Sequence, residues 1–167
     1  MSALISVCQD SGESYAGYSQ EVAKNISYFL PIDSATANKI AYPMQLPSVG
    51  TRYSYELYIR CRCDLTPNSQ VNNFKVWYVS GLPTPGYTIT VNSGIISTYA
   101  APVDLLSTRG TRIDFTTKNS ELNSIALDGT LININDYTSW LVFQLEVLAT
   151  ANTGNHDVDY IIQYDEY

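Results

Sequence analysis

The sequence predicts an all-β protein, an antiparallel β-sandwich of jelly-roll or Greek-key type with about nine or ten strands and little helix. Three observations support this fold class. Apolar and polar residues alternate along several stretches, as in strands with one buried face. Turn-forming Gly, Pro, Asn and Asp separate these stretches at intervals of roughly 8 to 15 residues. The chain has 14 tyrosines, a residue type that favours strands. Its 167 residues suffice for a single domain over residues 1–167.

The first 50 residues carry the weakest strand pattern. Residues 3–7 predict a first strand, ended by the turn-forming residues 9–13. Residues 26–30 predict a second strand, which ends at Pro31 because proline has no backbone N–H to donate. Residues 33–41 predict a helical turn with Asp33 or Ser34 as its N-cap.

Residues 51–63 form the clearest strand pattern. Its apolar face carries Tyr53, Tyr55, Leu57, Ile59, Cys61 and Cys63. Its polar face carries Arg52, Ser54, Glu56, Tyr58, Arg60 and Arg62. We expect this polar face to be solvated or to hold a local ion pair between the arginines and Glu56. A strand of this length in a small domain is expected to be bent or bulged.

The middle of the chain continues with short strands between turns. The predicted strands are residues 71–80, 86–92, 95–99, 111–117 and 124–127. Residues 71–80 are apolar on both faces, which is typical of a central or doubly covered strand. The dipeptide Asp128-Gly129 predicts a turn that makes residues 130–135 the hairpin partner of residues 124–127.

The two closing strands, residues 138–148 and 157–164, carry the strongest apolar pattern. If they pair, residues 149–156 form their connecting loop, with Gly154 as a breaker. Trp140 and Val142 lie opposite the main apolar stripe of the first strand. This strand is therefore expected to be covered on both sides, by another sheet or by a neighbouring subunit. The acidic end, residues 164–167, is interpreted as a strand terminus available to another chain.

The charge balance excludes some classes of function. Nine basic and sixteen acidic residues give a formal net charge of -7 and a pI near 4.4, which argues against a nucleic-acid-binding protein. No stretch approaches the roughly 18 apolar residues of a membrane span, and residues 1–10 lack the pattern of a signal peptide. We expect a soluble protein made in the cytoplasm that binds neither nucleic acid nor membrane.

Few residues suggest metal, cofactor or catalytic chemistry. Cys8, Cys61 and Cys63 are interpreted as buried free thiols, with neither disulfide nor metal. Asp157 and Asp159 fall on one side of a predicted strand and could hold Ca²⁺, but a solvated strand edge is the favoured interpretation. His156 is the only histidine, and no nucleophile motif accompanies it. We expect no cofactor and no enzymatic activity.

Aromatic side chains are the main candidates for contact with partners, because tyrosine and tryptophan suit interfaces and sugar platforms. Core packing is the alternative for each of them. The candidates are Tyr58, Trp77, Tyr87, Tyr99, Trp140, Tyr164 and Tyr167.

The C-terminal pattern of residues 137–151, Gly154 and residues 160–167 resembles small all-β virion proteins of tailed bacterial viruses, which are capsid decoration and head- or tail-associated subunits. This resemblance implies a structural protein of the virion that forms homo-oligomers and contacts capsid proteins. The chain has no basic arm for lining nucleic acid, so an outer position is expected. Two alternatives remain: a carbohydrate- or receptor-binding module that recognises a surface glycan, and a small β-sandwich glycosidase or lyase.

Overall fold

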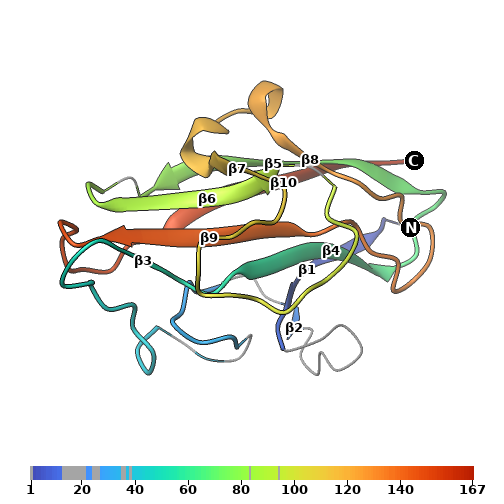
Figure 1. Cartoon of the computed structure of the whole chain (residues 1–167). Helices are drawn as coiled ribbons and strands as arrows, with labels where there is room; N and C mark the ends of the chain where they lie inside the picture. Colours follow the sequence, from blue (N-terminus) through green and yellow to red (C-terminus); the bar gives the residue numbers. More distant parts are fainter. Residues whose placement is uncertain are drawn as a thin grey trace.

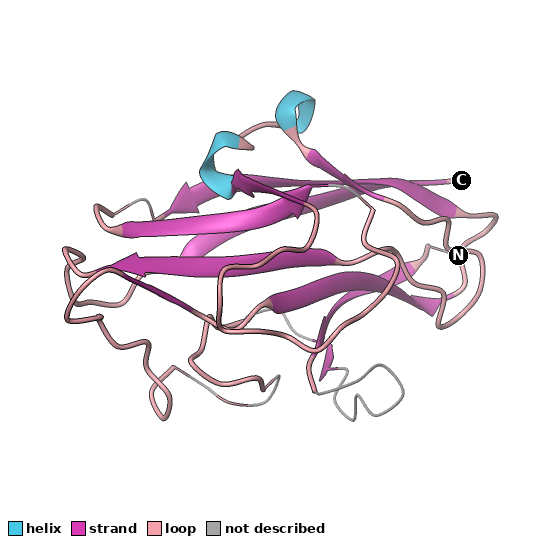
Figure 2. Cartoon of the chain, in the orientation of Figure 1, coloured by secondary structure: helices cyan, strands magenta, loops and turns pink. Residues whose placement is uncertain are grey.

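The protein is a sandwich of two antiparallel sheets (Figures 1 and 2). The computed structural model describes residues 2–12, 22–23, 27–34, 37, 39–82, 84–93 and 95–167. The larger sheet contains β1 (Leu4–Asp10), β2 (Val22–Ala23), β3 (Thr51–Tyr53), β4 (Leu57–Leu65), β6 (Tyr87–Ser93), β7 (Thr111–Asp114) and β9 (Leu141–Leu148). The smaller sheet contains β5 (Val71–Gly81), β8 (Ile125–Leu127) and β10 (Val158–Glu166). Two 3₁₀ turns, η2 (Phe115–Thr117) and η3 (Glu121–Asn123), follow β7.

The strand connections are those of a jelly roll. From β4 to β10 the chain alternates between the two sheets, except at the antiparallel β6–β7 pair. The orders β4-β9-β6-β7 and β10-β5-β8 follow from this path. In a jelly roll the first strand normally pairs with the last. Here β1 pairs with β4 in the larger sheet, so no described strand occupies the position beside β10.

The main core lies between the sheets and follows the predicted alternation. Leu141, Phe143, Leu145 and Val147 of β9 point inward and are all buried. From the smaller sheet, Phe74 and Val76 pack against them. The 3₁₀ turn after β7 adds Phe115, whose ring meets that of Phe143 edge-on at 5.0 Å between centroids. The prediction of an all-β sandwich is confirmed.

A second buried layer covers the outer face of the larger sheet. The strand predicted over residues 51–63 is interrupted at residues 54–56, in agreement with the expectation that so long a strand is bent or bulged. Its supposedly solvated face is buried from Ser54 to Arg60, which corrects the prediction of a wet face. Residues 96–109, the yellow segment in Figure 1, cross over β4 and β9. They bury the side chains on this face.

Polar side chains in this second layer are paired across the covering segment. Gln144 donates to Ser54 O and Leu105 O, at 3.0 and 2.7 Å, and accepts from Ser107 N. Glu56 accepts from Val103 N and lies 3.7 Å from the Nε of Arg109. The expected ion pair between Glu56 and the arginines of its own strand is not formed, because Arg60 pairs with Asp10 and Arg62 with Asp64. β9 is covered on both sides, as predicted, but its second cover is residues 96–109 of the same chain, which are neither a sheet nor a neighbouring subunit.

The structure also corrects the predicted pairings. The two closing strands do not pair, because β9 lies in the larger sheet and β10 pairs with β5. Residues 124–135 form no hairpin, because β8 and Leu131 both pair with β5 and not with each other. β8 lies opposite residues 74–76 of β5, and Leu131 lies opposite Val71.

Several predicted elements are shorter or missing. The strand predicted over residues 111–117 ends at Asp114, where η2 begins. Of the strand predicted over residues 26–30, residue 26 lies outside the described residues and residues 27–30 are irregular. Of residues 95–99 only Ile96 forms a bridge, to Trp140. The predicted helical turn lies partly outside the described residues. Its described part has no helix, although Ser34 Oγ accepts from Ala37 N as a capping side chain does.

Candidate functional site

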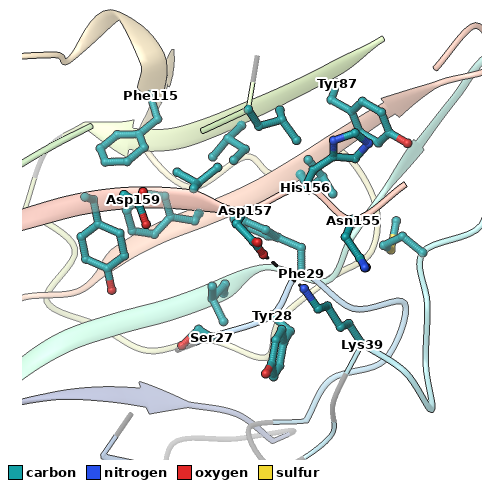
Figure 3. A pocket seen from close by; sticks show the side chains of 18 of the residues that line it. Ser27, Tyr28, Phe29, Lys39, Tyr87, Phe115, Asn155, His156, Asp157 and Asp159 are labelled. Atoms are coloured by element: carbon teal, nitrogen blue, oxygen red, sulfur yellow. Dashed lines mark hydrogen bonds and ion pairs between the residues drawn. The ribbon is translucent and has the colours of Figure 1, made fainter. Parts of the chain in front are cut away.

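A cleft of about 590 Å³ opens between the sheets beside the start of β10 (Figure 3). Its floor is the inner face of the larger sheet, and Val158 and Tyr160 of β10 form one wall. Irregular residues 27–29 and 39–44 complete the lining. Its volume falls within the usual range of small-molecule sites. The apolar lining comprises Phe29, Met44, Leu57, Ile59, Leu82, Ile89, Phe115, Phe143 and Leu145.

Polar groups gather at the mouth of this cleft. Lys39 Nζ lies 3.1 Å from Asp157 Oδ1, and Figure 3 shows the two side chains meeting there. His156 packs against the ring of Tyr87 at 4.6 Å, and its Nδ1 lies 3.4 Å from Thr84 Oγ1. The Nε2 atom of His156 is buried without a hydrogen-bond partner among the described residues. The mouth therefore places the Lys39–Asp157 ion pair and the His156 ring beside an apolar interior.

The cleft marks the open side of the sandwich. At the opposite end of β10 the sandwich is closed, because Glu166 accepts hydrogen bonds from Ser2 Oγ and Ala3 N, at 2.9 and 2.7 Å. Between the two ends, β10 pairs with β5 on one side and with no described strand on the other. Its inward-facing side chains Tyr160 and Ile162 are only partly buried, whereas Val76 of β5 is fully buried.

Three of the predicted contact residues are buried away from this side. Tyr58 and Trp140, on the outer face of the larger sheet, form a buried cluster with Tyr99 of the covering segment. The exposed fractions of Tyr58, Tyr99 and Trp140 are 0%, 4% and 5%, so none is open to a partner. Burial, with the charge of Glu56 second, raises the pKa of Tyr58 to about 12. For these three, the core alternative is the correct one.

A buried ion pair is attached to that cluster. Arg60 Nε lies 2.9 Å from Asp10 Oδ2, and both side chains are almost fully buried. Trp140 Nε1 donates to the same carboxylate at 2.5 Å. The guanidinium group lies between the rings of Tyr137 and Trp140, 3.8 and 4.7 Å from their centroids. This arrangement fixes the start of the chain to the larger sheet.

The other four predicted contact residues remain at least partly accessible. Trp77 pairs with Ile161 on the outer face of the smaller sheet, and Tyr164 packs against Phe74 at 5.5 Å. Tyr87 lines the cleft, and its hydroxyl donates to Asn152 O at 2.5 Å. Tyr167 is 62% exposed, although its backbone pairs with that of Gln70.

The described residues contain no group of three or more His, Cys, Asp or Glu side chains that could hold a metal ion. Asp157 and Asp159 do not share a ligand, since Asp157 pairs with Lys39 and Asp159 accepts from Ser80 Oγ. All three cysteines are free and buried, as predicted, and burial raises the pKa of Cys61 to about 12. Across the described part of the chain, no helix has the length and apolarity needed to span a membrane.

Sequence reasoning missed most of the residues that line the cleft. Phe29 and Lys39 come from segments that were predicted as a strand and a helical turn but are irregular, and Met44 comes from an irregular segment as well. All three meet β10 from more than 100 positions away in the chain. The Asp157-His156 pair was noticed only as a possible catalytic or metal cluster. Nothing in the sequence indicates that Lys39 and Asp157, which have opposite charges, lie close together in the fold.

Comparison of the chain with known family models, with curated proteins and with solved structures finds no match.

Proposed function

We propose that this chain is a non-enzymatic structural protein of a virus particle, a decoration or auxiliary capsid subunit that assembles with copies of itself and with capsid proteins. The observation that supports this proposal most directly is the smaller sheet. Among the described residues this sheet has three strands, and β10 leaves one edge without a described partner. Edge strands pair readily with other chains unless they are protected.

The outer face of the same sheet adds apolar surface. Trp77 and Ile161 are neighbours there, and Val79 is 49% exposed beside them. Leu122, in the 3₁₀ turn that precedes β8, is fully exposed. Exposed apolar groups in close proximity are typical of surfaces that other proteins cover.

The proposal is tested by the mass of the purified chain in solution at micromolar concentration and by its cosedimentation with purified virus particles. Trp77→Ser is expected to reduce both self-association and particle binding at least tenfold without changing the far-ultraviolet circular dichroism. Leu105→Ser, which removes an exposed leucine from the opposite side of the molecule, is the matched control. A strictly monomeric chain that never cosediments with particles refutes the proposal.

The cleft supports a second candidate, the binding of a small apolar molecule with a polar head. This differs from the predicted glycan platform of exposed aromatic rings, because the lining of the cleft is mainly aliphatic and aromatic core residues and Trp140 is buried elsewhere. Leu145→Trp adds bulk to the cleft lining and is expected to weaken binding of 8-anilinonaphthalene-1-sulfonate at least tenfold in isothermal titration. A native chain that binds no such probe with one-to-one stoichiometry rejects this candidate.

A further inference from the structure

We propose that β10 accepts an extended segment of a partner protein as the fourth strand of the smaller sheet, and that this segment carries basic residues alternating with apolar ones. The inference deepens the proposed structural function, on which it rests, by naming the contact surface and the chemistry of the partner. It assigns the added strand to the position that β1 leaves open by pairing with β4.

The backbone of β10 supplies the first argument. Its nine residues, Val158–Glu166, form a regular antiparallel pair with β5 apart from two irregularities in register. In an antiparallel pair, alternate N–H and C=O groups point away from the partner strand. On β10, these outward-pointing backbone groups form no backbone hydrogen bond with any described residue. Just before the strand, Asp157 O accepts from Leu82 N on the side of β5. An incoming strand can therefore use a complete row of donors and acceptors.

The second argument is the exposure of the inward side chains of β10. Val158, Tyr160, Ile162 and Tyr164 all pack against the core, yet all are only partly buried. Residues at the same depth on β5 are shielded by strands on both sides. An apolar side chain on an added strand would cover this row and reach the cleft beside Tyr160.

The charge of β10 determines the polar half of the partner. Asp159 accepts from the hydroxyl of Ser80, Asp165 from the amide of Asn73, and Glu166 from Ser2 and Ala3. All of these donors are neutral, so within the described residues the three carboxylates have no cation beside them. Lys39, the nearby cation at the cleft, is already paired with Asp157. Opposite charges across a strand pair stabilise it, which favours lysine or arginine on the partner.

The same charges disfavour a second copy of this chain as the occupant. Antiparallel pairing of two β10 strands about Ile162 places Asp159 of one copy opposite Asp165 of the other. Like charges directly opposite each other destabilise a sheet. Self-association through the outer face of the sheet remains compatible with the strand addition.

The test uses the full chain and three synthetic nonapeptides. One alternates lysine and valine, the second replaces each lysine by glutamate, and the third repeats the first with alternate backbone nitrogens methylated on its pairing edge. Fluorescence anisotropy is expected to show the lysine peptide binding at least tenfold more tightly than either of the others. Amide hydrogen exchange within β10 is expected to slow on its addition.

Two variants separate strand addition from general charge attraction. Asp159→Lys combined with Asp165→Lys is expected to weaken lysine-peptide binding at least tenfold, while Asp104→Lys on the covering segment leaves it unchanged. If the double variant does not fold, the single variants Asp159→Asn and Asp165→Asn replace it, and each should weaken lysine-peptide binding while Asp104→Asn does not. Equal binding of the methylated peptide, or unchanged exchange in β10, overturns the proposal. If the chain still cosediments with virus particles after such a result, the proposed structural function stands and only the strand addition at β10 is refuted.

Discussion

The buried ion pair between Asp10 and Arg60 allows one prediction to be developed in detail. Both side chains are almost fully buried, at 1% and 4% exposure, and Trp140 donates to the same carboxylate. Asp10→Asn removes the negative charge but leaves an oxygen that can accept from Trp140. Arg60→Met removes the positive charge while keeping most of the side-chain volume. The two changes therefore isolate the charge pair from the hydrogen bond and from the packing.

Each single change leaves one uncompensated charge in a site without water. Breaking a buried pair in this way costs about 3–5 kcal/mol of the free energy of unfolding. The double variant leaves no charge, so it should lose only the contacts of the guanidinium with Tyr137 and Trp140, about 2 kcal/mol. The pair is thus expected to show a coupling energy of at least about 4 kcal/mol, since two single losses of at least about 3 kcal/mol exceed the double loss by that amount.

Urea unfolding followed by tryptophan fluorescence measures these differences. With a denaturant slope of about 2 kcal/mol per molar, each single variant should unfold at a urea concentration lower by about 1.5–2.5 M. Arg62→Met is the control, because Arg62 pairs with Asp64 at a half-buried site and should cost less than about 1 kcal/mol. Single variants that lose less than 1 kcal/mol, or a double variant that loses the sum of the two, would refute the reasoning.

Three further predictions concern other parts of the fold. Gln144→Leu removes the hydrogen-bond partner of Ser107 N and Leu105 O in the covering segment and should lower the free energy of unfolding by about 3 kcal/mol. Trypsin should then cleave faster after Arg109, and unchanged cleavage would contradict this role of Gln144. Gly81→Ala places a Cβ atom 2.1 Å from Asp157 O and should lower the free energy of unfolding in urea by more than about 2 kcal/mol. Gly50→Ala meets no atom within 4 Å and should cost about 1 kcal/mol for its left-handed backbone alone. Equal losses would argue against the clash at Gly81. Burial raises the pKa of Tyr160 to about 12, so unfolding releases its proton and stability should fall as the pH rises from about 10 towards 12. Tyr160→Phe should make this fall shallower, and an identical pH dependence would reject the assignment.

The local pattern of the chain predicted the strands and their inward faces because alternation has a period of two residues whatever the partner strand. It predicted that β9 is covered on both sides, since Trp140 and Val142 lie opposite its apolar stripe. It failed for the face that carries Glu56 and Arg60, where charge was taken to mean solvent. A buried charge requires a partner, and Asp10 lies 50 residues away from Arg60.

The cleft could not be predicted from the sequence for a similar reason. Its mouth joins Lys39 to Asp157, and neither residue has a neighbour in the chain that points to the other. The predicted pairing of the closing strands failed because the strength of an apolar pattern does not specify a partner. Strands that both need burial can meet in one sheet or face each other across a core, and only the connections of the whole chain distinguish these outcomes.

The sequence by itself thus determined the all-β class, the positions of most strands, the buried thiols and the acidic character of the last strand. Each of these follows from local alternation, from composition or from the chemistry of a single side chain. The tertiary structure alone decided which sheet each strand joins, that residues 96–109 cover the larger sheet, and that β1 leaves β10 with an open edge. Those outcomes depend on contacts between distant residues, whose relative stability is set by how the whole chain packs.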